Sequence, residues 1–182
     1  MIDRVVAIGG PPGSGKSTAG RLVASELALE YRSAGDVFRA EAKTRGLDLE
    51  AFGRFAETHP EVDRSLDATM QALARPGVLL DGRIQAALCR RAGRPVYAIV
   101  VTAEEAERAR RVAQRDGQSL PDALTQIRAR TDSERTRYRR IYDLDPESEP
   151  VDLTVDSTTT PAAKVAERIV HFLRSRSPGG AR

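Results

Sequence analysis

The chain of 182 residues has no tryptophan, a single cysteine and no long apolar run. The lone Cys89 cannot form an internal disulfide, and its place in a predicted helix favours a packing role over a nucleophilic one. No stretch of about 18 apolar residues is present, so no membrane-spanning helix is predicted. The N-terminus lacks the basic-then-apolar pattern of a signal peptide. We therefore expect a cytoplasmic protein with no membrane partner.

Aromatic residues and lysines are scarce as well. Four Phe and four Tyr offer no recognisable platform for stacking bases, which argues against a nucleic-acid-binding protein. Three of the 29 basic residues are lysines, so 26 are arginines, and the net charge is +3. The planar fork of an arginine grips a phosphate at two points. This composition suits an enzyme that handles several phosphates, although net charge by itself does not identify the partner.

One segment constrains the function more tightly than composition does. Residues 10–17 read GPPGSGKS and match the phosphate-binding pattern G-x-x-x-x-G-K-[ST] at every fixed position. Glycines let successive N–H groups turn toward phosphate oxygens, Lys16 supplies a positive charge, and Ser17 offers a hydroxyl to Mg²⁺. The residues predicted to bind ATP are Gly10, Pro11, Pro12, Gly13, Ser14, Gly15, Lys16, Ser17 and Thr18.

The neighbours of this segment favour a phosphate loop over a plain flexible turn. Residues 4–8 form a short apolar, β-branched run that is typical of a buried parallel strand, and residues 18–27 carry helix formers with apolar side chains at helical spacing. Strand, loop and helix thus come in the order that a phosphate loop requires. The helix also directs the positive end of its dipole at the bound anion.

Strand-like and helix-like segments alternate along the rest of the chain. Four further strands are predicted, at residues 29–33, 78–80, 96–101 and 153–155. Helix starts are predicted at Ser33, at a capping box over Thr102–Glu105, at Ser119 and at Thr160. Five strands interleaved with helices indicate an α/β fold with a parallel sheet, whose ligands bind beyond the carboxyl ends of the strands. We expect a single domain over residues 1–174 and a disordered tail over residues 175–182.

A first polar cluster, Ser33-Ala34-Gly35-Asp36-Val37-Phe38-Arg39, lies where the second predicted strand ends. A glycine turns the chain there, and one helical turn later Arg39 faces back toward the strand ends, where an acceptor phosphate could bind. The alternative is an ordinary helix capped by Ser33 with one surface arginine. The cluster alone favours this alternative.

A second cluster, Asp81-Gly82-Arg83, directly follows the apolar strand at residues 78–80. Asp-Gly is typical of a hairpin turn, but a helical segment rather than a partner strand comes next. Asp81 therefore has the position of a Walker-B-like acid that holds Mg²⁺ or its water shell. Arg83 is placed to reach the transferring or acceptor phosphate.

A third cluster lies on a long arginine-rich helix predicted over residues 119–141. Arg130, Glu134 and Arg137 are spaced i, i+4 and i+7, which places them on one face. They form either part of a substrate site or a solvated salt-bridge ladder, and the spacing alone favours neither. Three arginines of the preceding helix also share a face, next to the glycine break where a lid would hinge: Arg108, Arg111 and Arg115.

Together these motifs resemble the cytidylate kinases, especially their short archaeal type. The resemblance covers about residues 4–172. Besides the three motifs at residues 10–17, 33–39 and 81–83, it includes His59-Pro60-Glu61-Val62-Asp63-Arg64 and Ser133-Glu134…Arg137-Tyr138…Ile141-Tyr142. It implies a three-layer P-loop kinase fold with a helical segment that binds the nucleoside monophosphate (NMP), at about residues 35–75, and a lid at about residues 108–120. It also implies Mg²⁺-assisted phosphorylation of CMP, and of dCMP, by ATP; we expect a monomer with these small-molecule partners.

The resemblance also implies roles for individual residues. Arginines would bind the CMP phosphate or the transferring phosphoryl group, Glu134 would contact the ribose, and Asp63 and Arg64 are candidates for reading the base. With the groups described above, the predicted catalytic residues are Lys16, Arg83, Arg130 and Arg137. The predicted substrate-binding residues are Ser33, Gly35, Arg39, Asp63, Arg64, Gly82, Arg83, Glu134 and Arg137. The predicted metal ligands are Ser17 and Asp81.

The chain departs from the family pattern at three points. Bacterial cytidylate kinases carry an acidic residue after the Gly-Arg pair, where this chain has Ile84, and a longer NMP-binding insertion that is missing here. Archaeal-type members often have threonine in place of Lys16. Two alternatives therefore stay open: a P-loop kinase for a different nucleotide or small-molecule acceptor, and a nucleotide-dependent RNA-binding or switch protein, which would show steeply salt-dependent RNA binding.

Overall fold

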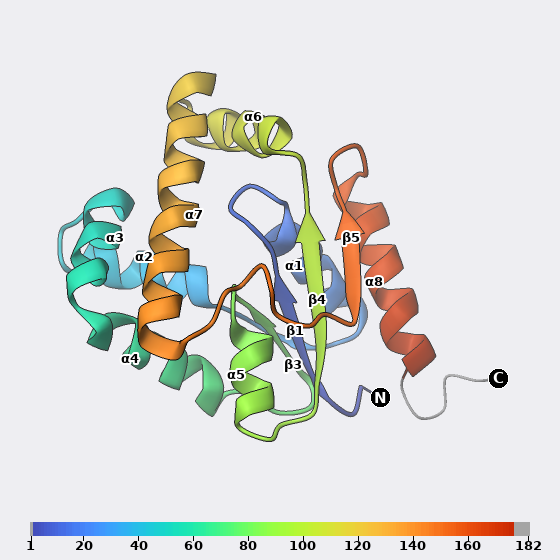
Figure 1. Cartoon of the computed structure of the whole chain (residues 1–182). Coiled ribbons are helices and arrows are strands. Elements are labelled where there is room, and N and C mark those ends of the chain that lie inside the picture. The colour runs from blue at the N-terminus through green and yellow to red at the C-terminus, as the bar shows by residue number, and fades with distance from the viewer. Residues whose placement is uncertain (1, 177–182) are drawn as a thin grey trace.

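The computed structural model describes residues 2–176 and contains a five-stranded sheet with helices on both faces (Figure 1). All strand pairs are parallel, as the alternation of strands and helices predicts. The strands are β1 (Val5–Gly9), β2 (Glu30–Ser33), β3 (Val78–Asp81), β4 (Val96–Thr102) and β5 (Leu153–Asp156). Each predicted strand is confirmed to within one residue at either end.

The strand order is β2-β3-β1-β4-β5, so β1 occupies the centre of the sheet. Asp81 pairs in register with Ile8 on one side and with Ser33 on the other. The carboxyl ends of these three strands therefore meet at one edge. The loop at residues 10–17 and the clusters at residues 33–39 and 81–83 all begin at this edge, because each follows one of the three strands directly.

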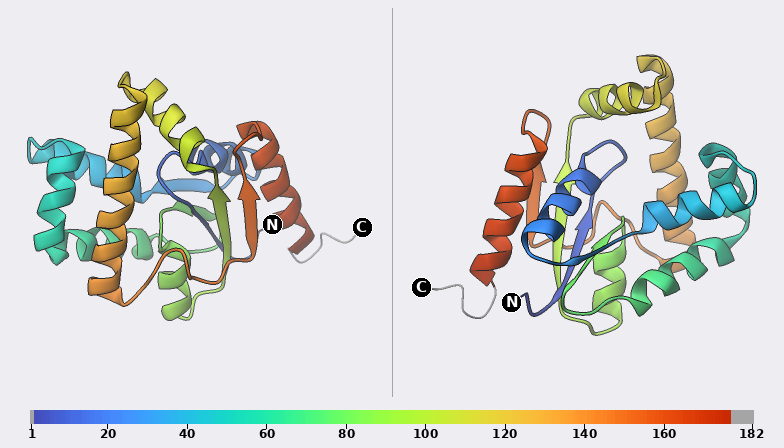
Figure 2. Two further views of the ribbon diagram at one scale, coloured as in Figure 1. Left: turned by 45° about the horizontal axis from the view of Figure 1, so that its top comes forward. Right: turned by 180° about the vertical axis from the view of Figure 1, so that it is seen from behind.

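Helices cover both faces of the sheet and extend beyond its carboxyl edge (Figures 1 and 2). Within residues 2–176 no helix has both the length and the apolar character needed to cross a membrane. The helices are α1 (Lys16–Glu26), α2 (Ala34–Thr44), α3 (Leu49–Thr58), α4 (Pro60–Ala72), α5 (Gln85–Arg91), α6 (Glu105–Asp116), α7 (Leu120–Tyr142) and α8 (Ala162–Arg176).

The two faces of the sheet have separate apolar cores because side chains alternate along each strand. From β1, Val6 and Ile8 pack with α1 and α8, whereas Val5 and Ala7 pack with side chains of α4 and α5. Two layers of helices thus enclose the sheet, which confirms the predicted three-layer α/β fold. Cys89 is buried in the second core, as a packing residue.

Two helical units lie beside and above the sheet. Helices α2 to α4 share their own small core around the fully buried Phe52, and α6 packs against the first half of α7 around Ile127. Figures 1 and 2 show α7 running alongside α3 and extending up to α6. The site at the carboxyl edge is therefore flanked by α7 and by both helical units. Residues 35–75 and 108–120 fall within them, but their predicted roles as NMP-binding segment and lid remain predictions.

Two predictions about element ends are wrong. The residue before α6 is Glu104 rather than Thr102, which stays in β4. Glu104 N–H is bonded to Thr158 Oγ1 at 2.9 Å, so a neighbouring loop replaces the predicted capping box. Helix α8 continues to Arg176 because Leu173 keeps it packed on the core, so residues 175 and 176 are helical. Residues 177–182 of the predicted tail lie outside the described residues.

Candidate active site

The loop at residues 10–17 connects β1 to α1 and depends on its glycines. Gly10, Gly13 and Gly15 have φ angles of 140°, 80° and 81°, which residues with a Cβ adopt only at a cost. A Cβ on Gly10 would also lie 2.1 Å from the carbonyl oxygen of Val101. Helix α1 begins at Lys16, two residues earlier than predicted. The first turn of a helix has N–H groups without a partner inside the helix, and in α1 this turn starts within the loop, as anion binding requires.

Lys16 lies partly buried at the point where several charged elements converge. Removal from water lowers the pKa of its amine, whereas the negative charges of Asp81 and Glu134 raise it, and the positive charges of Arg130 and Arg83 lower it. These residues come from α1, α7, the end of β3 and the turn that follows β3. The predicted catalytic lysine thus shares one electrostatic environment with two of the three other predicted catalytic residues.

Asp81 ends β3 and is buried. The hydroxyl of Tyr31 donates a hydrogen bond to Asp81 Oδ2 at 2.5 Å, and burial together with this carboxylate raises the pKa of Tyr31. The sequence analysis missed Tyr31. The sequence did contain a signal for it. Side chains alternate along a strand, so Tyr31, two residues before Ser33, lies on the same face of β2 as Ser33.

The residues near this carboxylate fit Mg²⁺ held mainly by a nucleotide. Asp81 raises and Ser17 lowers the pKa of the Tyr31 hydroxyl, so the two predicted metal ligands both lie close to this group. Among the described residues no cluster of three or more His, Cys, Asp or Glu side chains could hold a metal by itself. Mg²⁺ commonly uses one or two carboxylates and completes its shell with water and substrate phosphates.

Arg83 is a buried cation with unused donors. Its side chain is 7% exposed, and its Nε lies 3.1 Å from Oε2 of Glu134. Despite this ion-pair distance, Nε and Nη2 of Arg83 have no hydrogen-bond partner within residues 2–176, and neither has Glu134 Oε2. Burying an unsatisfied charged donor is costly. The arrangement therefore suits an anion that supplies the missing acceptors.

The predicted face of α7 is not a solvated salt-bridge ladder. Glu134 is only 14% exposed and lies between Arg83 and Arg130, whose Nη2 is 3.5 Å from Glu134 Oε1. Arg137 points to a different partner: its Nη1 donates to both carboxylate oxygens of Asp63 on α4, at 2.8 and 2.9 Å. Arg137 Nε has no partner in the described part of the chain. One face of α7 thus contacts the phosphate region and the α2–α4 unit.

Within residues 2–176, Arg39 and Arg64 form no ion pair with the charged groups around Arg83. Ser33 caps α2 by accepting a hydrogen bond from Asp36 N at 3.1 Å, and the half-exposed Arg39 pairs with Asp36. This geometry is that of the capped-helix alternative. Arg64 is exposed on α4. Arg39 lies over Gly35, where a Cβ would be 3.4 Å from Nη1, so Gly35 gives the guanidinium room.

Gly82 belongs to the site through close packing. A Cβ at this position would lie 2.9 Å from Gln85 Cγ and 3.1 Å from Ala34 Cβ, distances that the surrounding side chains do not allow without a shift. The N–H of Gly82 donates to the carbonyl of Ile8 at 3.1 Å. The Asp-Gly pair is therefore a strand-to-helix turn that holds Arg83 against β1, and not a hairpin.

A buried polar network that the sequence analysis missed lies behind Arg137. Asp67 accepts hydrogen bonds from Gln85 Nε2 at 2.7 Å and from the Tyr142 hydroxyl at 2.9 Å, and Gln71 Nε2 donates to Gln85 Oε1 at 2.8 Å. Burial raises the pKa of Asp67 to about 6. The network joins α4, α5 and α7. A sequence signal existed, since Asp67 follows Asp63 by one helical turn on α4.

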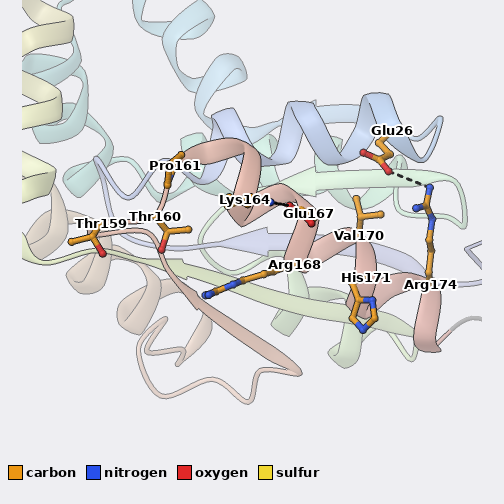
Figure 3. Close-up of a pocket in the computed structure, with 10 residues that line it drawn as sticks. All are labelled: Glu26, Thr159, Thr160, Pro161, Lys164, Glu167, Arg168, Val170, His171 and Arg174. Atoms are coloured by element: carbon orange, nitrogen blue, oxygen red, sulfur yellow. Dashed lines mark hydrogen bonds and ion pairs between the residues drawn. The ribbon is translucent and has the colours of Figure 1, made fainter.

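A separate groove of about 640 Å³ runs along the outer side of α8 (Figure 3). Its charged side chains pair with each other at the surface, as Lys164 does with Glu167 and Arg174 with Glu26. No predicted site residue lines it. The groove is therefore not part of the candidate active site.

Comparisons with known proteins identify the family. The family model AAA_17, described as an AAA domain, matches residues 9–139. A cytidylate kinase of Aeropyrum pernix is 40% identical over 153 residues, which cover 83% of this chain and 88% of that protein. A cytidylate kinase of Archaeoglobus fulgidus is 34% identical over 168 residues, which cover 91% of this chain and 92% of that protein.

The fold also has solved counterparts. A shikimate kinase from Acinetobacter baumannii, solved in complex with shikimate, superposes with a TM-score of 0.62 at 17% identity and covers 96% of this chain and 94% of its own. This likeness concerns the fold alone. The level of identity to the two archaeal proteins, over nearly their whole length, shows that the chain belongs to the cytidylate kinase family.

Proposed function

We propose that this protein transfers the γ-phosphoryl group of ATP to CMP, and also to dCMP, with the help of Mg²⁺. The observation that supports phosphoryl transfer best is the buried Arg83 guanidinium, which has two unpaired donors beside Lys16 and Glu134. The names of the relatives point to CMP as the acceptor.

Each group has a role that follows from its position. The N–H groups of the loop and Lys16 hold the ATP phosphates, and Ser17 and Asp81 hold Mg²⁺, which neutralises charge on the phosphates when bound. Arg83 and Arg130 stabilise the negative charge that spreads over the transferring group. An acceptor phosphate is already ionised at neutral pH, so no catalytic base is needed. Catalysis then consists of alignment and charge neutralisation.

The two helical units are proposed to close over the substrates. Residues 35–75 would bind the monophosphate and residues 108–120 would form the lid, with Arg39 and Arg137 reaching the CMP phosphate once the units move. The charges of Arg130 and Arg39 help to lower the pKa of Asp116, after the larger effect of its hydrogen bond with Arg115. The end of α6 therefore faces both the phosphate region and α2. Closure would exclude water and limit hydrolysis of ATP.

A coupled assay of ADP release tests this proposal. Purified protein is mixed with ATP, Mg²⁺ and one acceptor at a time: CMP, dCMP, UMP, AMP or GMP. The proposal predicts the highest kcat/KM for CMP and dCMP. If only another acceptor stimulates ADP release strongly, the protein is a kinase with a different specificity. If ADP release is slow and no acceptor changes its rate, the switch-protein alternative is favoured.

A further inference from the structure

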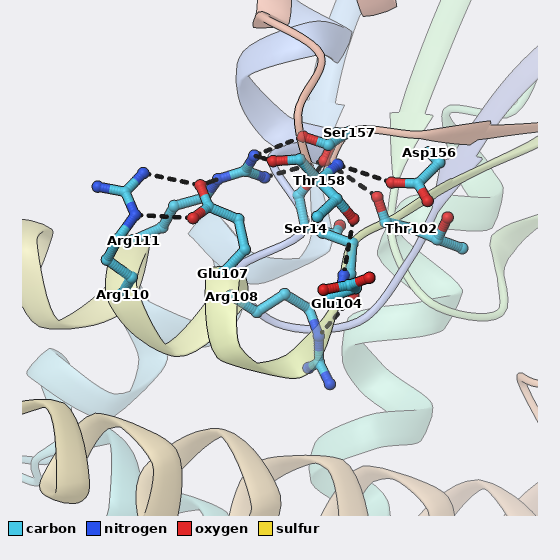
Figure 4. Close-up of polar contacts among 11 residues, drawn as sticks. Ser14, Thr102, Glu104, Glu107, Arg108, Arg110, Arg111, Asp156, Ser157 and Thr158 are labelled. Carbon is cyan, nitrogen blue, oxygen red and sulfur yellow. Dashed lines mark hydrogen bonds and ion pairs between the residues drawn. The ribbon is translucent and has the colours of Figure 1, made fainter.

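Hydrogen bonds connect the phosphate loop to two other segments of the chain, the start of the loop after β5 and helix α6 (Figure 4). Ser157, the first residue after β5, is buried, and its hydroxyl lies 2.8 Å from the carbonyl oxygen of Ser14 in the loop. Arg111 on α6 donates from Nη1 to this hydroxyl at 2.9 Å and from Nη2 to the Ser157 carbonyl at 2.6 Å. Arg108, one turn earlier, donates to the loop carbonyl of Pro12 at 3.2 Å.

The hydrogen-bond partners of the Ser157 hydroxyl determine where its proton points. A hydroxyl has one proton and can accept further bonds. Because Arg111 can only donate, Ser157 Oγ accepts from it and keeps its proton for a carbonyl: that of Ser14, or that of Thr102 at 3.0 Å. The backbone N–H of Ser157 already donates to Thr102 at 2.8 Å. Because the Thr102 carbonyl already accepts that bond, we assign the hydroxyl proton of Ser157 to the loop carbonyl of Ser14.

The direction of the Ser14 carbonyl matters for anion binding. In a phosphate loop the N–H groups must turn toward the phosphates, so neighbouring carbonyls have to point outward and find other partners. Ser157 and Arg108 bind the outward carbonyls of Ser14 and Pro12. Between them lies Gly13, where a Cβ would come within 2.7 Å of the Arg108 carbonyl oxygen. The loop therefore has almost no freedom on this side.

We infer that Ser157 is a positioning residue for ATP binding: its hydroxyl, held by Arg111, keeps the loop carbonyl of Ser14 outward and the loop N–H groups ready for phosphate. The inference rests on the proposed function only in that the loop binds ATP. It goes beyond that function because Ser157 is not one of the residues proposed to act on the substrates and contacts the loop only through the Ser14 carbonyl. If the buried Ser14 carbonyl loses the donor that Ser157 supplies, we expect this carbonyl to change its orientation and the binding geometry of the loop to change with it.

The variant Ser157→Ala tests this role. We expect its Kd for Mg²⁺·ATP, measured by titration calorimetry, to rise about tenfold, the effect of leaving one buried acceptor unpaired. The KM for CMP should change less than twofold, because Arg83 and Glu134 lie on other elements. Ser157→Thr keeps the hydroxyl and should restore ATP binding. A matched control is Tyr97→Phe, which removes a buried hydroxyl that donates to the carbonyl of Arg176 at 2.9 Å, away from the loop.

The outcomes separate positioning from general stability. If Ser157→Ala and Tyr97→Phe lower Tm alike and neither changes the Kd for ATP, Ser157 only holds the fold together and the inference is wrong. Equal losses in ATP and CMP binding would also overturn it. If wild-type protein binds ATP but does not phosphorylate CMP, the proposed acceptor is wrong while the comparison of ATP affinities still tests Ser157.

Discussion

Arg83 carries two buried donors that its ion pair with Glu134 leaves without a hydrogen bond within residues 2–176. Its side chain is buried, and Nε and Nη2 have no hydrogen-bond partner in the described part of the protein. Such a preorganised cation loses its water when the protein folds, and it can then stabilise the negative charge that develops in the transition state. The same reasoning applies to Lys16, whose burial lowers its pKa.

We predict that Arg83→Ala lowers kcat for CMP phosphorylation by a factor on the order of 10² to 10³, as expected when one preorganised stabilising group is lost. Lys16→Met should have a similar effect. Arg135→Ala is the control, because Arg135 pairs with Asp145, and neither of these residues is a predicted site residue. Near-normal turnover of the Arg83 or Lys16 variant in a steady-state assay would show that the residue has been given the wrong role.

Glu134 tests the substrate side of the site. If its carboxylate accepts a hydrogen bond from the ribose, Glu134→Gln should raise KM for CMP more than KM for ATP, with a loss of about 1 to 3 kcal/mol in kcat/KM. The preference for CMP over dCMP should narrow if the 2′-hydroxyl is the donor. Equal effects on both substrates, with a lower Tm, would instead mean that Glu134 mainly neutralises Arg83 and Arg130.

At the scale of elements, Asp67 links α4, α5 and α7 through a buried network. Burial raises its pKa from the usual 3.8 to about 6. Between about pH 4 and pH 6 the folded protein therefore binds more protons at this carboxyl than the unfolded chain does. Its contribution to stability is present at low pH and is lost as the pH rises through this window.

Asp67→Asn removes this titration while keeping the shape of the side chain. We predict that the difference in unfolding free energy, wild type minus variant, falls by roughly 2 kcal/mol between about pH 4 and pH 7. Urea denaturation of both proteins across this range measures it. A difference that stays constant with pH would show that Asp67 keeps an ordinary pKa in the folded protein.

Strands and helix starts were predicted well where residues close together in the sequence determine them. The β-branched run before the phosphate loop and the cap at Ser119 are confirmed, because strand burial and helix capping depend on neighbours in sequence. The capping box at Thr102 failed because Glu104 N–H donates instead to the hydroxyl of Thr158, which lies 54 residues after Glu104. Tyr31, Asp67 and Ser157 were missed for the same reason: each acts through a partner that only the fold brings close.

At the scale of the whole molecule, three parallel strands bring the loop, Ser33 and Asp81 to one edge, and α7 adds Arg130 and Glu134 from the side. The sheet and the two layers of helices could be predicted from the alternation of strands and helices. The pairing of Arg39 with Asp36 agrees with the capped-helix alternative that the first cluster alone favoured. The α2–α4 unit has its own small core around Phe52, and α4 also contributes Met70 to the core on one face of the sheet.

Transfer of labelled phosphate tests the central claim most directly. ATP labelled in its γ-phosphate is mixed with excess protein, Mg²⁺ and CMP for a single turnover, and the products are separated. The proposed function predicts that the label appears in CDP, with little in inorganic phosphate, and that Arg83→Ala slows its appearance. Label that appears in inorganic phosphate at the same rate with and without CMP, and none in CDP, would contradict it.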